Sequence, residues 1–276
     1  MAIPANRLGL PEMLKKRILS ALVALVVLGI VLFVLPVTAA RSFIGILILA
    51  AAWEWAGFLF VNQPPALRLT YVAFIAVLIG VLAFNLPNAA LTDGLLKAAL
   101  AWWFIALIWI FFYPTPVTKP VSWLCGALVM VPAWLALDFL YVRSPGLLLF
   151  ALLIVWVADI GAYFVGKRFG RVKLAPKISP GKTWEGVLGG LCAVLLLAAV
   201  GSYFLQIEIS VLVPFCLAVA MLSVVGDLTV SMFKRSAGVK DSGTLFPGHG
   251  GLLDRIDSVT AAAPLFALAL AWIGLR

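Results

Sequence analysis

The chain has 276 residues, of which 64% are hydrophobic and 11% charged, and its formal net charge is +9. So few charges over this length exclude a soluble globular protein and indicate a membrane protein that crosses the bilayer several times. The positive charge requires no nucleic-acid partner, because basic loops that face anionic lipid headgroups account for it. Cys125, Cys192 and Cys216 lie in apolar segments without metal-ligand spacing, and we expect them to be packing residues.

A spanning helix needs about 20 mostly apolar residues. Nine stretches of the sequence meet this requirement: residues 18–36, 42–61, 68–87, 96–113, 121–141, 146–167, 185–205, 209–233 and 258–275. We therefore expect an all-α polytopic membrane protein with about nine transmembrane helices. A single integral membrane domain over residues 1–276 would comprise apolar spans in 1–145, followed by catalytic spans and loops in 146–276.

The basic residues predict the orientation of these spans. With the N-terminus in the cytoplasm, sixteen of the twenty Lys and Arg residues fall on the cytoplasmic side. Only Arg41, Lys97, Arg143 and Arg276 fall on the opposite side. Nine spans then place the C-terminus outside, and the two longest polar loops, 168–184 and 234–257, face the cytoplasm, where nucleotides are available.

Acidic residues within the second and sixth spans are candidates for function. Glu54 lies in a Trp-Glu-Trp sequence of the second span, and its role stays open between structural and functional. Asp159 lies in the sixth span, with Tyr163 and Gly166 on the same helical face. Asp159 either packs by hydrogen bonding between helices or lines a pocket, and we favour the pocket because the span leads directly into the first basic loop.

The first basic loop contains Gly181-Lys182-Thr183, which resembles the end of a phosphate-binding P-loop. The P-loop interpretation fails, because Pro176 stands where the motif needs its first glycine and no strand is expected before the loop. The loop otherwise carries Lys173, Lys177 and Ser179, and a helix is expected to begin near Thr183. A helix N-terminus beside lysines can bind phosphate, although a solvated basic loop would also explain the pattern. Beyond this point, Gly186, Gly189 and Gly190 predict close helix packing.

The eighth span carries Asp227, which is expensive to place in a bilayer, at roughly 2.5–3.5 kcal/mol. Val230, Ser231 and Lys234 follow at positions that share its helical face. A salt bridge to Lys234 would explain Asp227 without function. We favour a metal ligand, because Asp254 returns to the same region.

The second polar loop concentrates glycines, charges and the single histidine. Gly248, Gly250 and Gly251 allow the backbone to approach a ligand closely. His249 is either a structural residue or a phosphate contact. Asp254 and Asp257 share one face of the following helix, and their hard oxygens suit Mg²⁺.

These residues resemble the phosphatidate cytidylyltransferase family, also called CDP-diacylglycerol synthase. The family signature runs Ser-x-apolar-Lys-Arg, four residues, Lys-Asp, and then Pro-x-His-Gly-Gly-x-x-Asp-Arg-x-Asp. This chain matches it without a break at Ser231, Lys234, Arg235, Lys240, Asp241, Pro247, His249, Gly250, Gly251, Asp254, Arg255 and Asp257. The resemblance is strong over residues 155–260 and rests on architecture elsewhere.

The resemblance implies transfer of CMP from CTP to phosphatidic acid, in the bacterial cytoplasmic (inner) membrane, with the active site facing the cytoplasm. The predicted catalytic residues are Asp227, Asp254, Lys234, Arg235 and Asp241, with Asp227 and Asp254 as ligands of Mg²⁺. The predicted substrate-binding residues are Lys240, His249, Gly250, Gly251, Arg255, Asp257, Asp159, Lys177, Ser179 and Lys182. The expected partners are CTP, phosphatidic acid and membrane lipids. A second cation and a homodimer are compatible with the sequence, which specifies neither.

One residue departs from the family pattern. The family usually carries Glu in Gly-Asp-Leu-Thr-Glu-Ser, where this chain has Val230. The change removes a carboxylate beside Asp227, so a catalytically weakened homologue is one alternative. A related lipid nucleotidyl- or phosphotransferase and a polytopic transporter are the others, although no internal repeat of the kind common in transporters is evident.

Overall fold

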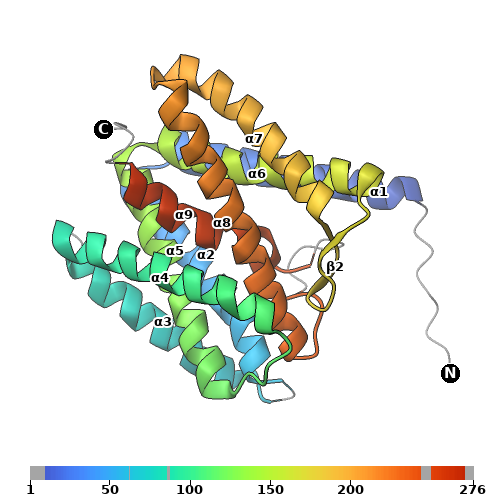
Figure 1. The fold of residues 1–276 in the computed structure, drawn as a ribbon. Coiled ribbons are helices and arrows are strands. Elements are labelled where there is room, and N and C mark those ends of the chain that lie inside the picture. Colours follow the sequence, from blue (N-terminus) through green and yellow to red (C-terminus); the bar gives the residue numbers. More distant parts are fainter. Residues whose placement is uncertain (1–9, 62, 86–87, 244–249, 271–276) are drawn as a thin grey trace.

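A computed structural model describes residues 10–61, 63–85, 88–243 and 250–270 of the chain. Within them the chain forms nine helices and one short hairpin (Figure 1). The helices are α1 (Leu10–Phe33), α2 (Val37–Leu59), α3 (Ala66–Asn85), α4 (Ala89–Phe112), α5 (Lys119–Arg143), α6 (Pro145–Phe169), α7 (Trp184–Leu205), α8 (Ile209–Ser236) and α9 (Leu253–Ala269). The strands of the hairpin are β1 (Lys173–Ala175) and β2 (Ser179–Thr183).

Each predicted span corresponds to one of these helices, but not all of them are long and apolar enough to cross a bilayer. Seven of the described helices, α2 to α8, meet both conditions. α1 contains a shorter apolar stretch over Leu22–Phe33, and α9 has 17 residues. The chain is therefore a polytopic membrane protein with seven candidate spans, whereas the expected nine spans and the sides of the two termini stay predictions.

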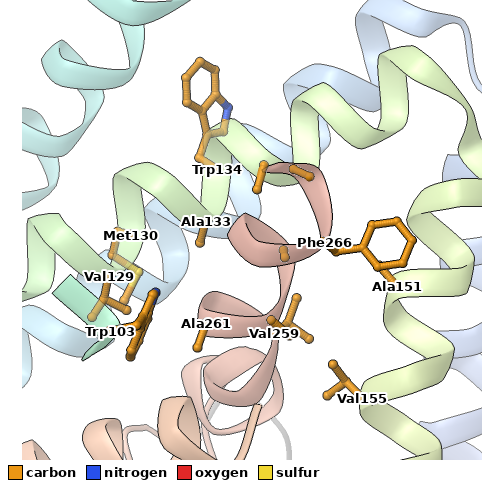
Figure 2. Packing of buried hydrophobic residues seen from close by; sticks show 14 of the residues in the cluster. Trp103, Val129, Met130, Ala133, Trp134, Ala151, Val155, Val259, Ala261 and Phe266 are labelled. Atoms are coloured by element: carbon orange, nitrogen blue, oxygen red, sulfur yellow. The ribbon is translucent and has the colours of Figure 1, made fainter. Parts of the chain in front are cut away.

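α9 forms the centre of the bundle, where it packs against α2, α4, α5, α6 and α8. Figure 2 shows Trp103 of α4, Met130 of α5 and Val155 of α6 lying around the side chains of α9. Phe266 of α9 is fully buried and stacks against Phe215 of α8, with ring centroids 5.0 Å apart. A helix whose later turns are apolar on all sides suits such an enclosed position. The surrounding bundle thereby holds the N-terminal end of α9, with its acidic residues, in one place.

A short hairpin lies within the predicted loop 168–184 of this otherwise helical fold, and no described strand precedes that loop, as expected. β1 pairs antiparallel with β2, with Lys173 opposite Thr183 and Ala175 opposite Ser179. Strands of three and five residues carry too few apolar positions to show an alternating pattern in the sequence. The P-loop interpretation still fails, because Gly-Lys-Thr itself lies in extended strand β2. α7 begins where expected, and Thr183 caps it, with its hydroxyl accepting the Gly186 N–H at 3.1 Å.

α6 and α7 run side by side (Figure 1) and approach each other closely through glycines. A Cβ atom added at Gly190 would lie 2.6 Å from the Ala158 carbonyl oxygen, and one at Gly186 would lie 3.0 Å from that of Ala162. This contact confirms the packing predicted for the glycines of the seventh span. It also sets the width of the cleft described below.

Candidate active site

A cleft of about 500 Å³ lies between α6, α7, α8 and the β-hairpin. Most of its lining is apolar, including Ala158, Ala162, Val187, Leu191, Ala220 and Val224. Charged and polar side chains also line it: Asp159, Lys167, Ser179, Lys182 and Asp227. The cleft thus combines a surface suited to hydrocarbon with a cluster of charges, which suits an amphipathic ligand.

Asp227 of α8 carries the central carboxylate of this cleft. Its Oδ2 lies 2.6 Å from Lys182 Nζ on β2, and both side chains are 25% exposed. Its Oδ1 accepts a hydrogen bond from the Ser231 hydroxyl at 3.2 Å, one helical turn further along α8. The shared face of Asp227 and Ser231 is therefore confirmed. The alternative explanation, a salt bridge from Asp227 to Lys234, is wrong, because Asp227 pairs with Lys182 and Lys234 pairs with Asp254.

Two further acids lie close to Asp227. Asp257 of α9 is buried, and its carboxylate is near enough to that of Asp227 for the two charges to repel each other. Asp159 of α6 lines the same cleft and is also close enough to Asp227 for the two carboxylates to interact electrostatically. The tight approach of α8 and α9 depends on Gly226, where an added Cβ would lie 2.6 Å from the Asp257 carbonyl oxygen. Three helices therefore deliver one acid each to the same region.

Asp254, the other predicted metal ligand, pairs with Lys234. Its Oδ1 accepts a hydrogen bond from Lys234 Nζ at 2.7 Å, and both side chains are largely buried. Its Oδ2 accepts the backbone N–H groups of Ser242 and Gly251, each at 2.9 Å. Asp254 thus joins Ser242 to Gly251 within the second polar loop.

Glu54 of α2 reaches the same loop from the N-terminal half of the chain. It is buried, and its carboxylate accepts hydrogen bonds from the N–H groups of Leu252 and Leu253 and from the Ser242 hydroxyl. The sequence left its role open, because neither its span nor its neighbours identify a partner almost 200 residues away in the chain.

Arg235 connects the second polar loop with the hairpin. Its Nε donates to the Ile178 carbonyl oxygen at 3.1 Å, and its Nη1 donates to that of Val239 at 3.3 Å. The arginine therefore holds the turn of the hairpin against the end of α8. Contact with a phosphate remains a prediction for this residue.

The remaining predicted residues differ in how the structure places them. Gly250 has a φ of +81°, a conformation that favours glycine, and an added Cβ would lie 2.7 Å from Asp254 Oδ2. Ser179 lines the cleft, Lys177, Lys240 and Asp241 are exposed, Arg255 lies in the first turn of α9, and His249 lies outside the described residues.

The predicted magnesium site can be compared with the acidic side chains of the described residues. In the described parts of the chain, no group of three or more His, Cys, Asp or Glu side chains is arranged to hold a metal by itself. Mg²⁺ does not need such a group, because it commonly uses one or two carboxylates, keeps waters and shares phosphate oxygens. Asp227 already holds a cationic group, the Lys182 ammonium, against its Oδ2. The metal roles of Asp227 and Asp254 stay predictions.

Sequence reasoning missed three contributors to the site: the pairing of Lys182 with Asp227, the anchoring role of Glu54, and Lys167 in the wall of the cleft. Lys167 was identifiable only as a basic residue at the end of the sixth span. Its Nζ lies 5.6 Å from the ring centroid of Tyr163, one turn earlier in α6. The spacing of Lys167 and Tyr163 could have suggested this contact.

Several known proteins are similar to this chain over most of its length. Residues 15–273 match the model of a family described as the cytidylyltransferase family. A phosphatidate cytidylyltransferase of Pseudomonas aeruginosa is 44% identical, over 94% of this chain and 97% of the relative. A second phosphatidate cytidylyltransferase, from Haemophilus influenzae, is 38% identical over 92% of this chain and 98% of the relative. A third, from Staphylococcus saprophyticus, is 34% identical over 93% of this chain and 99% of the relative.

Proposed function

The chain belongs to the cytidylyltransferase family, and we propose that it transfers CMP from CTP to phosphatidic acid. The products are CDP-diacylglycerol and pyrophosphate. The observation that carries the proposal is the cleft in which Asp227 and Lys182 meet beside an apolar surface, because a lipid phosphate needs both environments. Three relatives that bear this activity in their names match over almost their whole lengths.

The reaction requires little acid–base chemistry. The phosphate of phosphatidic acid is already anionic near neutral pH, so its oxygen can attack the α-phosphorus of CTP directly. The new P–O bond forms as the bond to the β-phosphate breaks, and pyrophosphate leaves with the electron pair. Catalysis then depends on holding the two anionic groups in line and neutralising their charge.

The side chains of the site suit that task. Lys182 of β2 and Lys234 of α8 are each placed against a carboxylate. Arg235 of α8 bonds to the turn of the hairpin that carries Lys182, and Lys240 follows shortly after α8. We assign these cations to the triphosphate and the lipid phosphate, with Asp227 and Asp254 as the residues that would hold Mg²⁺. When bound, that ion would neutralise the charge that develops on the pyrophosphate.

The cleft also supports a position for the lipid. Its apolar lining, including Leu191 and Val224, suits acyl chains, while Ser179 and Lys182 lie where a headgroup phosphate would sit. We place this end of the bundle at the cytoplasmic face of the bacterial inner membrane, because the basic residues of both polar loops favour that side.

The test is to incubate purified protein in detergent with labelled CTP, phosphatidic acid and Mg²⁺, and to look for a labelled lipid. Formation of labelled CDP-diacylglycerol supports the proposal and excludes a purely transporting role, because detergent micelles enclose no compartments. A panel of other lipid phosphates tests the acceptor. Absence of product with phosphatidic acid, or a clear preference for another acceptor, would contradict the assigned reaction.

A further inference from the structure

Glu54 is a buried acid for which the proposed chemistry has no use. It lies in α2, and only 6% of its surface is exposed. Its Oε1 accepts the Leu252 N–H at 2.9 Å, and its Oε2 accepts the Leu253 N–H at 2.8 Å and the Ser242 hydroxyl at 2.7 Å. A carboxylate satisfied by three donors from one distant segment is a built contact rather than incidental packing.

These bonds supply a cap that α9 lacks in its own sequence. Leu252 occupies the N-cap position, and its apolar side chain makes no capping hydrogen bond. The first N–H groups of a helix have no partner within the helix, and its N-terminal end favours a negative charge. Glu54 therefore provides both the acceptor and the charge from another helix.

The loop backbone also closes around Glu54. A Cβ added at Gly243 would lie 2.6 Å from Glu54 Oε1, and one at Gly251 would collide with both Glu54 and Ser242. Ser242 and Gly251 also donate their N–H groups to Asp254. The two ends of the segment 242–251 are consequently held between two carboxylates, one from α2 and one from α9.

We propose that Glu54 is a positioning residue for cytidylyl transfer. It touches no reacting group. It anchors Ser242 on one side of the segment 243–251, and Leu252 and Leu253 on the other, to α2. The anchoring thereby keeps the Lys234–Asp254 pair in register with Asp227. The N-terminal half of the chain then contributes to the site as well as to the membrane-spanning bundle, because its helix α2 helps to set the geometry of the site. The effect on turnover rests on the proposed function, whereas the anchoring of the segment does not.

The test compares Glu54→Gln, Glu54→Asp and a matched control, Asp138→Asn. Glutamine keeps the shape of the side chain, but its amide nitrogen cannot accept a hydrogen bond, so at least one donor loses its partner. Asp138 is also a buried acid tied to α2, through Arg41 at 2.7 and 2.9 Å. Arg41 precedes Glu54 by about four helical turns, or roughly 20 Å along α2, so the control leaves the polar loop intact.

Three measurements are made on each variant in lipid nanodiscs: kcat and KM for CTP and phosphatidic acid, the thermal midpoint, and the rate of trypsin cleavage after Lys240, identified by fragment mass. Lys240 is exposed beside the anchored segment, so its cleavage reports on anchoring without any catalysis. We expect Glu54→Gln to lower kcat roughly 10- to 100-fold, as for other residues that orient the residues of a site without touching the substrate. We also expect it to accelerate cleavage after Lys240. Glu54→Asp keeps the charge and should therefore retain part of the native kcat and part of the native resistance to cleavage. Asp138→Asn should lower the thermal midpoint and leave kcat and the cleavage rate close to those of the native chain.

Native kcat and native cleavage in Glu54→Gln would overturn the proposal. Equal losses of kcat in Glu54→Gln and Asp138→Asn would also overturn it, because they would show general destabilisation. If the native chain makes no CDP-diacylglycerol, the proposed function fails separately. Cleavage after Lys240 then decides the anchoring by itself, and an unchanged rate in Glu54→Gln refutes it.

Discussion

Replacing Lys182 with Met should strengthen metal binding while weakening substrate use. Lys182 Nζ lies 2.6 Å from Asp227 Oδ2, so the ammonium occupies the face of the carboxylate that a divalent ion would need. Any ion that binds there has to displace Lys182, which then becomes available for a phosphate oxygen. Methionine has a similar length and no charge, and it removes the competitor without opening a large void.

The structure sets the size of the effect. Both side chains are 25% exposed, so the pair lies between an open surface pair, worth about 0–1 kcal/mol, and a buried pair, where removing one partner costs about 3–5 kcal/mol. An intermediate value of about 1.5 kcal/mol corresponds to roughly a tenfold change in an equilibrium constant. We therefore expect about tenfold tighter metal binding in Lys182→Met, together with a higher KM for a phosphate-bearing substrate.

Metal binding can be measured without catalysis, by following free Mn²⁺ by electron paramagnetic resonance in the absence of CTP. Titration of activity with Mg²⁺ gives a second estimate. The control is Lys97→Met, which breaks another Lys–Asp pair of 2.7 Å, with Asp93, on exposed side chains of α4. Lys97→Met should leave Mn²⁺ affinity unchanged. Unchanged or weaker Mn²⁺ binding in Lys182→Met would refute the competition between Lys182 and the metal.

Three other changes test the site. Asp227→Asn should abolish turnover with little loss of thermal stability, since the amide keeps the shape of the side chain; near-native rates would remove Asp227 from the metal assignment. Gly250→Ala should lower activity, because its φ of +81° is strained for alanine and the added Cβ would lie 2.7 Å from Asp254 Oδ2; a native specific activity would show that the loop can relax. Val230→Glu should change the Mg²⁺ dependence of activity. It should also lower the thermal midpoint, because Val230 is fully buried among apolar side chains and the added carboxyl would lose its hydration. If neither measurement changes, this departure from the family pattern has no consequence. EDTA should stop the reaction and Mg²⁺ should restore it, and product formed in excess EDTA would exclude a divalent ion.

Local patterns determined much of this protein. Apolar runs in the sequence marked the position of every described helix. A spanning helix must form its backbone hydrogen bonds within itself, so it appears in the sequence as one uninterrupted apolar segment. The helical repeat correctly placed Ser231 beside Asp227, and the hydroxyl of Thr183 caps the helix predicted to start there. The signature residues identified the family before any contact was known.

Only the tertiary structure decided which charges meet. The sequence suggested Lys234 as a partner for Asp227, since the two share a helical face, but Lys182 from the hairpin takes that position and Lys234 turns to Asp254. Glu54 finds its donors 188 to 199 residues away. Such pairings depend on how separate helices pack, and helix packing is set by many shape contacts, such as that of Gly226 with Asp257, that leave no periodic trace in the sequence.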